Sequence, residues 1–134
     1  MDNPKDYSKY TVLIVDDIPV NIILLKTMLA RINVQILTAV DGGQALETVR
    51  KLKPELVLLD IQMPVMDGYE AAKAIRRSSS PHALSIPIIA MTANAFEDDK
   101  RASMEAGMNA HISKPIDFES LKETILCYRR KRDR

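Results

Sequence analysis

Short apolar runs alternate along this chain with longer amphipathic stretches, and few folds accommodate that pattern. The clearest run, at residues 56–59, has no polar residue and is typical of a strand buried on both faces. Less uniform runs, most of them with a polar residue, lie at 11–15, 35–40, 87–91 and 110–113, and the stretches between the runs carry apolar residues at helical spacing. Strands that alternate with helices predict βαβ units and a single parallel sheet.

Capping residues place the expected helices. Pro19 opens the first, Gly107 closes the fourth, and Asp117 N-caps the last. The helices are expected at 19–32, 44–52, 69–77, 96–106 and 117–128. The tripeptide at 41–43 indicates a turn, and the segment at 78–82 indicates a mobile connector.

Length and composition favour one soluble domain. The 134 residues predict a domain over 10–128, between a polar lead-in at 1–9 and a basic tail at 129–134. A net charge of +1 gives no global field for nucleic acid, and the single cysteine, Cys127, excludes an internal disulfide. No apolar stretch is long enough to span a bilayer, so we expect a cytoplasmic protein or a cytoplasmic part of a membrane-bound one.

Polar residues of complementary chemistry stand at the carboxyl ends of four expected strands. Asp16 and Asp17 follow the first, Asp60 the third, Thr92 the fourth and Lys114 the fifth. In a parallel sheet these ends lie along one edge, where ligands bind. Three carboxylates there would repel one another without a cation, and magnesium prefers oxygen ligands. The set predicts a magnesium-assisted phosphoryl transfer onto an aspartate.

The roles divide by chemistry. The Asp60 carboxylate is the candidate nucleophile, and the Lys114 ammonium and Thr92 hydroxyl would neutralise phosphoryl oxygens. Each residue also has an ordinary explanation. Asp16 or Asp17 could cap the helix that begins at Pro19, Lys114 could pair with any acid, and Thr92 suits a strand end.

Two other functions use related residues. A magnesium-dependent phosphatase with an aspartyl nucleophile usually needs a second acid two residues later, where this chain has Gln62. A flavin- or nucleotide-binding domain would need a glycine- or hydroxyl-rich phosphate loop after the first strand, where Asp16 and Asp17 would repel phosphate. Both rank below phosphoryl transfer onto Asp60.

Several motifs in order resemble response-regulator receiver domains. They are Val15-Asp16-Asp17, the segment 60–68, the segment 91–95, and Gly107-Met108-Asn109 with Lys114-Pro115. The resemblance covers about residues 10–128. It implies a flavodoxin-like (βα)5 fold, with five parallel strands in order 2-1-3-4-5 and helices on both faces. It also implies a cis Lys114–Pro115 bond.

The resemblance further implies the site's roles. Asp60 would accept a phosphoryl group from a phosphohistidine. Asp16, Asp17, Asp60 and the backbone carbonyl of Gln62 would surround magnesium, with manganese as a substitute. Thr92 would couple the phosphate to the position of His111, where the family often has Tyr or Phe. Ile18, Gln62 and Asn94 would tune the lifetime of the phosphoryl group.

The motif wording is most similar to receiver domains of hybrid sensor histidine kinases. This implies a signalling switch rather than a stand-alone enzyme. Its expected partners are a histidine kinase or histidine phosphotransfer domain, and then a downstream protein or an onward relay. A second copy of the chain is a further candidate partner, whereas nucleic acid and membrane insertion are not expected. The output face would combine the fourth helix, the fifth strand and the last helix. An adaptor that binds without phosphorylation stays open as an alternative.

Overall fold

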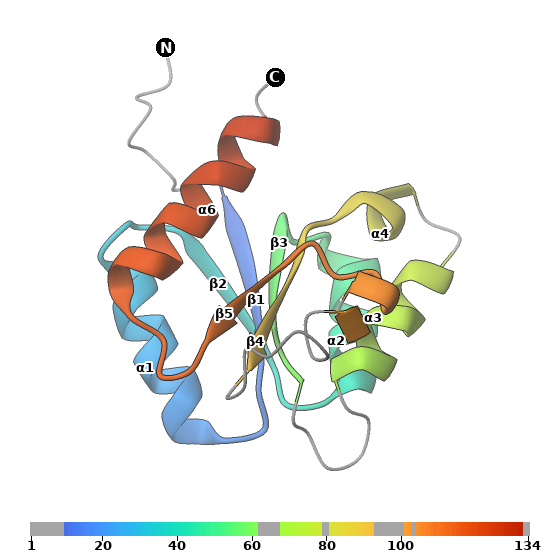
Figure 1. Cartoon of the computed structure of the whole chain (residues 1–134), viewed down its shortest axis with the longest axis horizontal. Helices are drawn as coiled ribbons and strands as arrows, with labels where there is room; N and C mark the ends of the chain where they lie inside the picture. The colour runs from blue at the N-terminus through green and yellow to red at the C-terminus, as the bar shows by residue number, and fades with distance from the viewer. Residues whose placement is uncertain (1–9, 62–67, 79–80, 93–100, 103, 133–134) are drawn as a thin grey trace.

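Five parallel strands form the centre of the protein (Figure 1). The computed structural model describes residues 10–61, 68–78, 81–92, 101–102 and 104–132. The sheet order is β2-β1-β3-β4-β5, which confirms the predicted order 2-1-3-4-5. Its strands are β1 (Thr11–Val15), β2 (Gln35–Ala39), β3 (Leu56–Asp60), β4 (Ile88–Thr92) and β5 (Ala110–Ser113).

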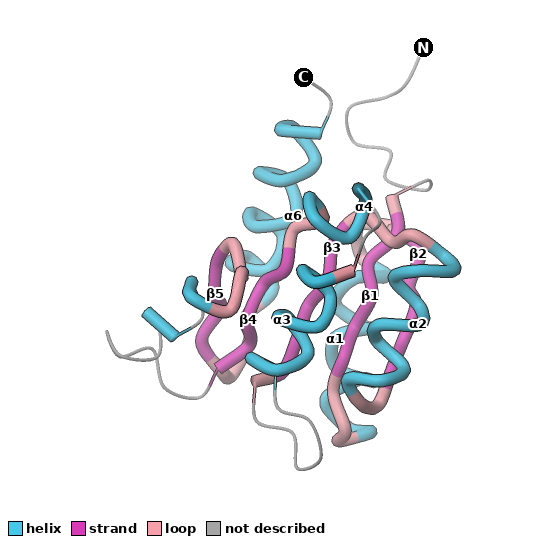
Figure 2. Tube along the Cα trace, turned by 90° about the vertical axis from the view of Figure 1, so that its right-hand side faces the viewer, coloured by secondary structure: helices cyan, strands magenta, loops and turns pink. Residues whose placement is uncertain are grey.

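Helices cover both faces of the sheet, as Figures 1 and 2 show. One face packs against α1 (Pro19–Ala30) and α6 (Phe118–Arg132), through Leu25 and Leu29 of α1 and Leu121 and Ile125 of α6. The other face packs against α2 (Gly42–Leu52), α3 (Gly68–Arg77) and the short α4 (Pro81–Ser85). β3 and β4 are buried along their whole length, as continuous apolar runs predict. Among the described helices, none combines the length and apolarity needed to cross a membrane.

The expected turn at 41–43 is instead the start of a helix. Asp41 is the N-cap of α2, and its Oδ1 accepts the backbone N–H of Gln44 at 2.8 Å. Because a capping carboxylate satisfies an N–H that has no partner in the first turn, the helix begins at Gly42 rather than Gln44.

The expected mobile connector at 78–82 is wrong for its last two residues. Pro81 and His82 begin α4, where proline at the first helical position costs no hydrogen bond. His82 Nε2 lies 2.6 Å from the Pro54 carbonyl oxygen, and Arg76 Nη1 donates to the Ala83 carbonyl at 3.0 Å. These contacts fix α4 against the rest of the domain. Residues 79–80 lie outside the described residues.

Other bounds differ by a few residues. α1 ends at Ala30 rather than at residue 32, and Asn33 takes a left-handed φ of 60° before β2. α6 continues to Arg132, so the first four residues of the expected basic tail extend that helix. Most of the helix expected at 96–106 lies outside the described residues. Its end is visible, where Gly107 has a φ of +95°, as a helix C-cap glycine should.

Strand register brings the predicted polar residues to one edge. Val15 pairs with Leu59, Asp60 with Met91, and Thr92 with Ser113. The residues that follow these pairs therefore leave the sheet side by side. A side-chain pattern along the chain becomes a cluster in space through this register alone.

Candidate functional site

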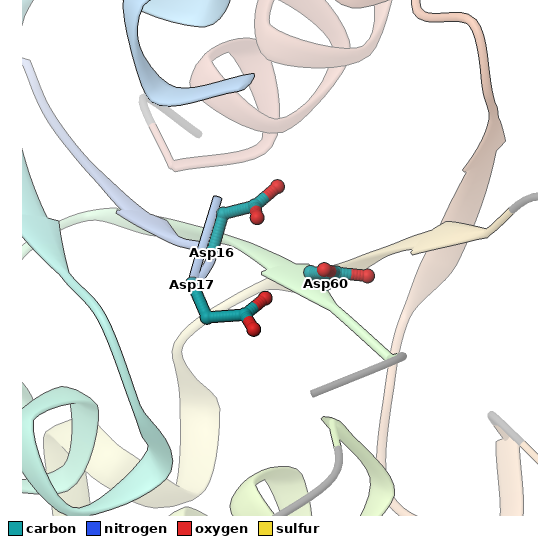
Figure 3. Close-up of side chains that lie close together, drawn as sticks. All are labelled: Asp16, Asp17 and Asp60. Atoms are coloured by element: carbon teal, nitrogen blue, oxygen red, sulfur yellow. The ribbon is translucent and has the colours of Figure 1, made fainter. Parts of the chain in front are cut away.

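Three carboxylates face a common space at the carboxyl edge of the sheet (Figure 3). Asp16 and Asp17 follow β1, and Asp60 is the last residue of β3. One oxygen from each lies within 4.8 Å of the others. Asp16 is 0% exposed and Asp60 1%, so their negative charges are largely withdrawn from water. The structure therefore brings together the three carboxylates that the sequence predicted to lie at this edge.

Burial raises the pKa of Asp16 above its ordinary value. The backbone N–H of Ile18 opposes this rise by donating to Asp16 Oδ1 at 2.9 Å. The negative charge of Asp60 raises the pKa further, whereas the Lys114 ammonium and a hydrogen bond with Asn21 lower it. The site therefore disfavours three simultaneous charges unless a cation joins them.

Two buried oxygens of this cluster lack a hydrogen-bond partner among the described residues. They are Asp16 Oδ2 and Asp17 Oδ1. A buried carboxylate oxygen without a donor is costly, and a bound cation would remove that cost. Hard oxygen ligands suit magnesium, so the donor set fits the predicted ion. Gln62, whose carbonyl was expected as a further ligand, lies outside the described residues.

Lys114 supplies the positive charge of the site. Its Nζ donates to Asp60 Oδ1 at 3.1 Å, and its side chain is 23% exposed. The backbone N–H of Lys114 donates to the Thr92 carbonyl at 2.7 Å, which ties the end of β5 to the end of β4. The following peptide bond, Lys114–Pro115, is cis. Thr92 is itself buried at the end of β4, on the same edge as Asp60.

The remaining predicted residues fall in different places. Ile18 stands at the rim beside Asp16 and is 45% exposed. His111 lies in the edge strand β5, half-buried and paired with Ala90. Asn94, expected to tune the site, lies outside the described residues.

Sequence reasoning missed Gly68, which begins α3. A Cβ there would lie 2.4 Å from Ile61 Cα and 2.7 Å from the Asp60 carbonyl oxygen. Only glycine allows the helix to approach the end of β3 this closely. Gly68 is the last residue of the 60–68 motif, which was a signal of its importance. Its steric role, however, required the structure.

Asn21 was missed as well. It lies in the first turn of α1, and its side-chain hydrogen bond acts on Asp16. The helical spacing of the apolar residues did not single out Asn21, because polar residues are common in the first turn of a helix.

A family model for the response regulator receiver domain matches residues 12–126. The chain belongs to this family. The sensor histidine kinase GacS of Pseudomonas protegens is 38% identical over 116 residues, which cover 86% of this chain and 13% of that kinase. The predicted similarity to receiver domains of hybrid sensor kinases is thereby confirmed. The chain spans only 12–13% of the length of the first curated relatives it matches.

Two solved structures are similar to this receiver domain and bear on its site. The receiver domain of a sensor histidine kinase from Pseudomonas aeruginosa PAO1 has magnesium in its active-site cleft. It is 34% identical to this chain, with a TM-score of 0.78, and the match covers 88% of this chain and 94% of that one. The receiver domain of Ssk1 from Saccharomyces cerevisiae was co-crystallised with the histidine phosphotransfer protein Ypd1. It is 30% identical, with a TM-score of 0.79 and coverage of 89% and 88%.

Proposed function

We propose that this receiver domain is a phosphorylation-activated switch in which Asp60 accepts a phosphoryl group from a phosphohistidine. The observation that carries the proposal is the placement of Asp60 between a lysine and two further carboxylates. Lys114 Nζ lies 3.1 Å from one Asp60 oxygen, and oxygens of Asp16 and Asp17 lie within 4.8 Å. A lone structural ion pair would not need the two additional acids.

The chemistry follows from these positions. An Asp60 oxygen attacks phosphorus while the bond to the donor nitrogen breaks. Negative charge on the transferring group spreads over three equatorial oxygens, and preorganised positive groups stabilise it. The Lys114 ammonium serves one oxygen, and the Thr92 hydroxyl is expected to serve another. Asp16, Asp17, Asp60 and the Gln62 carbonyl would hold magnesium, which when bound neutralises the carboxylates and a phosphoryl oxygen.

Exposed apolar side chains follow the two carboxylates of β1's end along the chain. Ile18, Val20 and Ile23 lie at the start of α1, directly after Asp16 and Asp17, and are 45%, 57% and 61% exposed. Exposed apolar residues gathered in one place mark interaction sites. A histidine kinase or phosphotransfer domain must cover this region to deliver its phosphoryl group to Asp60.

The output is proposed to pass through Thr92 to a face that would combine the helix expected at 96–106 with β5 and α6. The backbone N–H of Lys114 donates to the Thr92 carbonyl at 2.7 Å. This hydrogen bond links the acceptor edge to β5 and supports the proposed route. Thr92→Ala should leave Asp60 phosphorylated but weaken the phosphorylation dependence of partner binding. Full dependence in that variant would contradict the route. The switching role of His111 and the tuning roles of Ile18, Gln62 and Asn94 stay predictions. Asn94→Asp would test the role of Asn94, which an unchanged dephosphorylation rate would contradict.

Further expectations of the same proposal concern the setting of the domain. Manganese should replace magnesium, because it also prefers oxygen ligands. We expect a cytoplasmic location, free or within a membrane-bound kinase, and output to a downstream protein or an onward relay. Limited acceleration of its own phosphorylation and hydrolysis is expected, as is dimerisation if the output face pairs two copies.

Intact mass after incubation with acetyl phosphate and magnesium tests the proposal. The expected result is a gain of one phosphoryl group that is lost in Asp60→Asn and in a chelator control. Absence of labelling in a folded domain would require direct transfer from a phosphohistidine protein before the switch is abandoned. Failure there as well would leave a phosphorylation-independent adaptor.

A further inference from the structure

A pocket of about 390 Å³ opens beside the acceptor, between α1 and the connection from β5 to α6. Its polar end is made by Asp16, Asn21 and Lys114. Asp16 and Lys114 also flank Asp60, so the pocket and the phosphoryl site share two residues. An occupant that reaches the polar end of the pocket therefore contacts two residues that also flank Asp60.

The rest of the lining is apolar. It consists of Leu24, Leu25, Met28, Met91, Pro115 and Ile116. Leu25 and Met91 are buried and belong to the core between the sheet and α1, so they form a fixed wall. Leu24 is 54% exposed, which makes it a wall that can be changed without disturbing the core.

The polar and apolar linings of the pocket favour an occupant with one polar part and one apolar part. Near Lys114 and a bound cation, the favoured group is a phosphoryl oxygen. Along Leu24, Leu25 and Met28, the favoured group is a hydrocarbon, because its burial removes apolar surface from water. An acetyl group, with one methyl, would leave most of such a space to water. A longer acyl chain would occupy it.

We propose that this pocket binds the acyl chain of phosphodonors that are mixed anhydrides of phosphate with apolar carboxylic acids. The inference rests on the proposed function, since it names a substrate class for the same acceptor. In the reaction, an Asp60 oxygen forms a bond to phosphorus, and the bond from phosphorus to the acyl oxygen breaks. The electron pair leaves with the carboxylate, so no oxidant, reductant or proton is required.

The test compares acetyl, butyryl and hexanoyl phosphate as donors, with magnesium and the whole chain, by the rate of mass gain. Each buried methylene should raise kcat/KM about fourfold, the equivalent of ~0.8 kcal/mol. Part of the chain stays in solvent, so hexanoyl phosphate is expected to exceed acetyl phosphate by at least about tenfold. In Leu24→Asn the ratio of the two rates should fall toward one. Leu52→Asn, an equally exposed leucine on α2 outside the pocket, should retain the wild-type ratio.

Because the readout is a ratio within each variant, damage to chemistry or folding cancels. A flat or falling series with intact acetyl phosphate labelling would overturn the pocket and leave the switch standing. No labelling by any donor, including a phosphohistidine protein, would instead refute the proposed function. A loss in Leu24→Asn confined to transfer from a protein donor would assign the pocket to a partner side chain and overturn the acyl proposal.

A binding measurement supplies a second readout without turnover. Hexylphosphonate, which cannot transfer its phosphorus, should shift the methyl resonances of Leu25 and Met28 in the presence of magnesium. Methylphosphonate at the same concentration should shift them much less. Equal shifts for the two phosphonates would contradict an acyl-binding pocket.

Discussion

Asp16→Asn should stabilise the metal-free domain and destabilise the magnesium-bound one relative to wild type. Asparagine has nearly the same shape, and its Oδ1 can still accept the Ile18 N–H that Asp16 accepts at 2.9 Å. The change therefore removes a charge while it keeps the local hydrogen bond. The three carboxylates contribute oxygens within 4.8 Å of one another. At an effective dielectric constant of about 20, each pair at that distance repels by about 3 kcal/mol.

The net gain is smaller than this repulsion. Lys114 attracts Asp16, and this attraction is lost in the variant. We expect the metal-free variant to gain about 1–2 kcal/mol of unfolding free energy, a rise of roughly 3–8 °C in Tm for a domain of this size. With magnesium at about 100 times its Kd, wild type gains about 2.7 kcal/mol, and the variant should lose most of that gain. The order of the two proteins then inverts.

The pH dependence has a definite sign. The folded domain raises the pKa of Asp16 above its ordinary value of 3.8, so the folded state holds that proton more tightly than the unfolded chain. The contribution of Asp16 to stability is therefore lost as pH rises from near 3.8 through the raised value. The advantage of metal-free Asp16→Asn should grow over this window and vanish at lower pH.

Thermal unfolding in chelator and in magnesium, at several pH values, measures these effects. Asp117→Asn is the matched control, because Asp117 caps α6 by accepting the Ser120 N–H at 2.8 Å and has no part in the carboxylate cluster. It should leave the magnesium response unchanged. If Asp16→Asn were less stable than wild type without metal, the attraction between Asp16 and Lys114 would outweigh the repulsion among the carboxylates. The electrostatic argument would then be refuted.

Three further predictions test other parts of the structure. Gly68→Ala should lower the unfolding free energy by about 1–3 kcal/mol in urea titration, because its Cβ would meet Ile61 Cα at 2.4 Å. In the control Gly43→Ala, the Cβ would lie 3.3 Å from a side-chain oxygen, and the unfolding free energy should change by no more than about 0.5 kcal/mol. Lys114→Gln should slow labelling by acetyl phosphate about 100-fold, and a wild-type rate would remove Lys114 from the chemistry. Arg76→Met should cost about 2–4 kcal/mol in the same urea assay, since three oxygen acceptors within 3.0 Å each lose a hydrogen bond from the guanidinium. An unchanged midpoint would contradict that role.

The sequence alone was sufficient for the sheet and for five polar residues that the structure brings to its carboxyl edge. Continuous apolar runs specify buried parallel strands, and the order of the strands followed from the family resemblance. Asp16, Asp17, Asp60, Thr92 and Lys114 were predictable because each stands where a strand ends. A parallel sheet places all such ends on one edge, so one-dimensional position translates directly into proximity.

Predictions from local sequence failed where the same residues suit two different local conformations. Asp and Gly after a strand suit a turn, yet here Asp41 begins a helix by capping it. A serine-rich segment before Pro81 suggested a connector, yet contacts from Arg76 and Pro54 hold α4 in place. The contact between His82 and Pro54 joins residues 28 positions apart in the sequence, so no local pattern could show it.

Only the tertiary structure decided the energetics of the site. Three features depend on how β1, β3 and the end of β5 pack: the raised pKa of Asp16, the two carboxylate oxygens without a partner among the described residues, and the 3.1 Å contact from Lys114 to Asp60. The same holds for the close approach of Gly68 and for the apolar pocket beside Asp16 and Lys114. Burial and distance are properties of packed elements. The sequence could name the candidate reacting groups, but their charges, their spacing and the shape of the space around them arise when the helices close over the sheet.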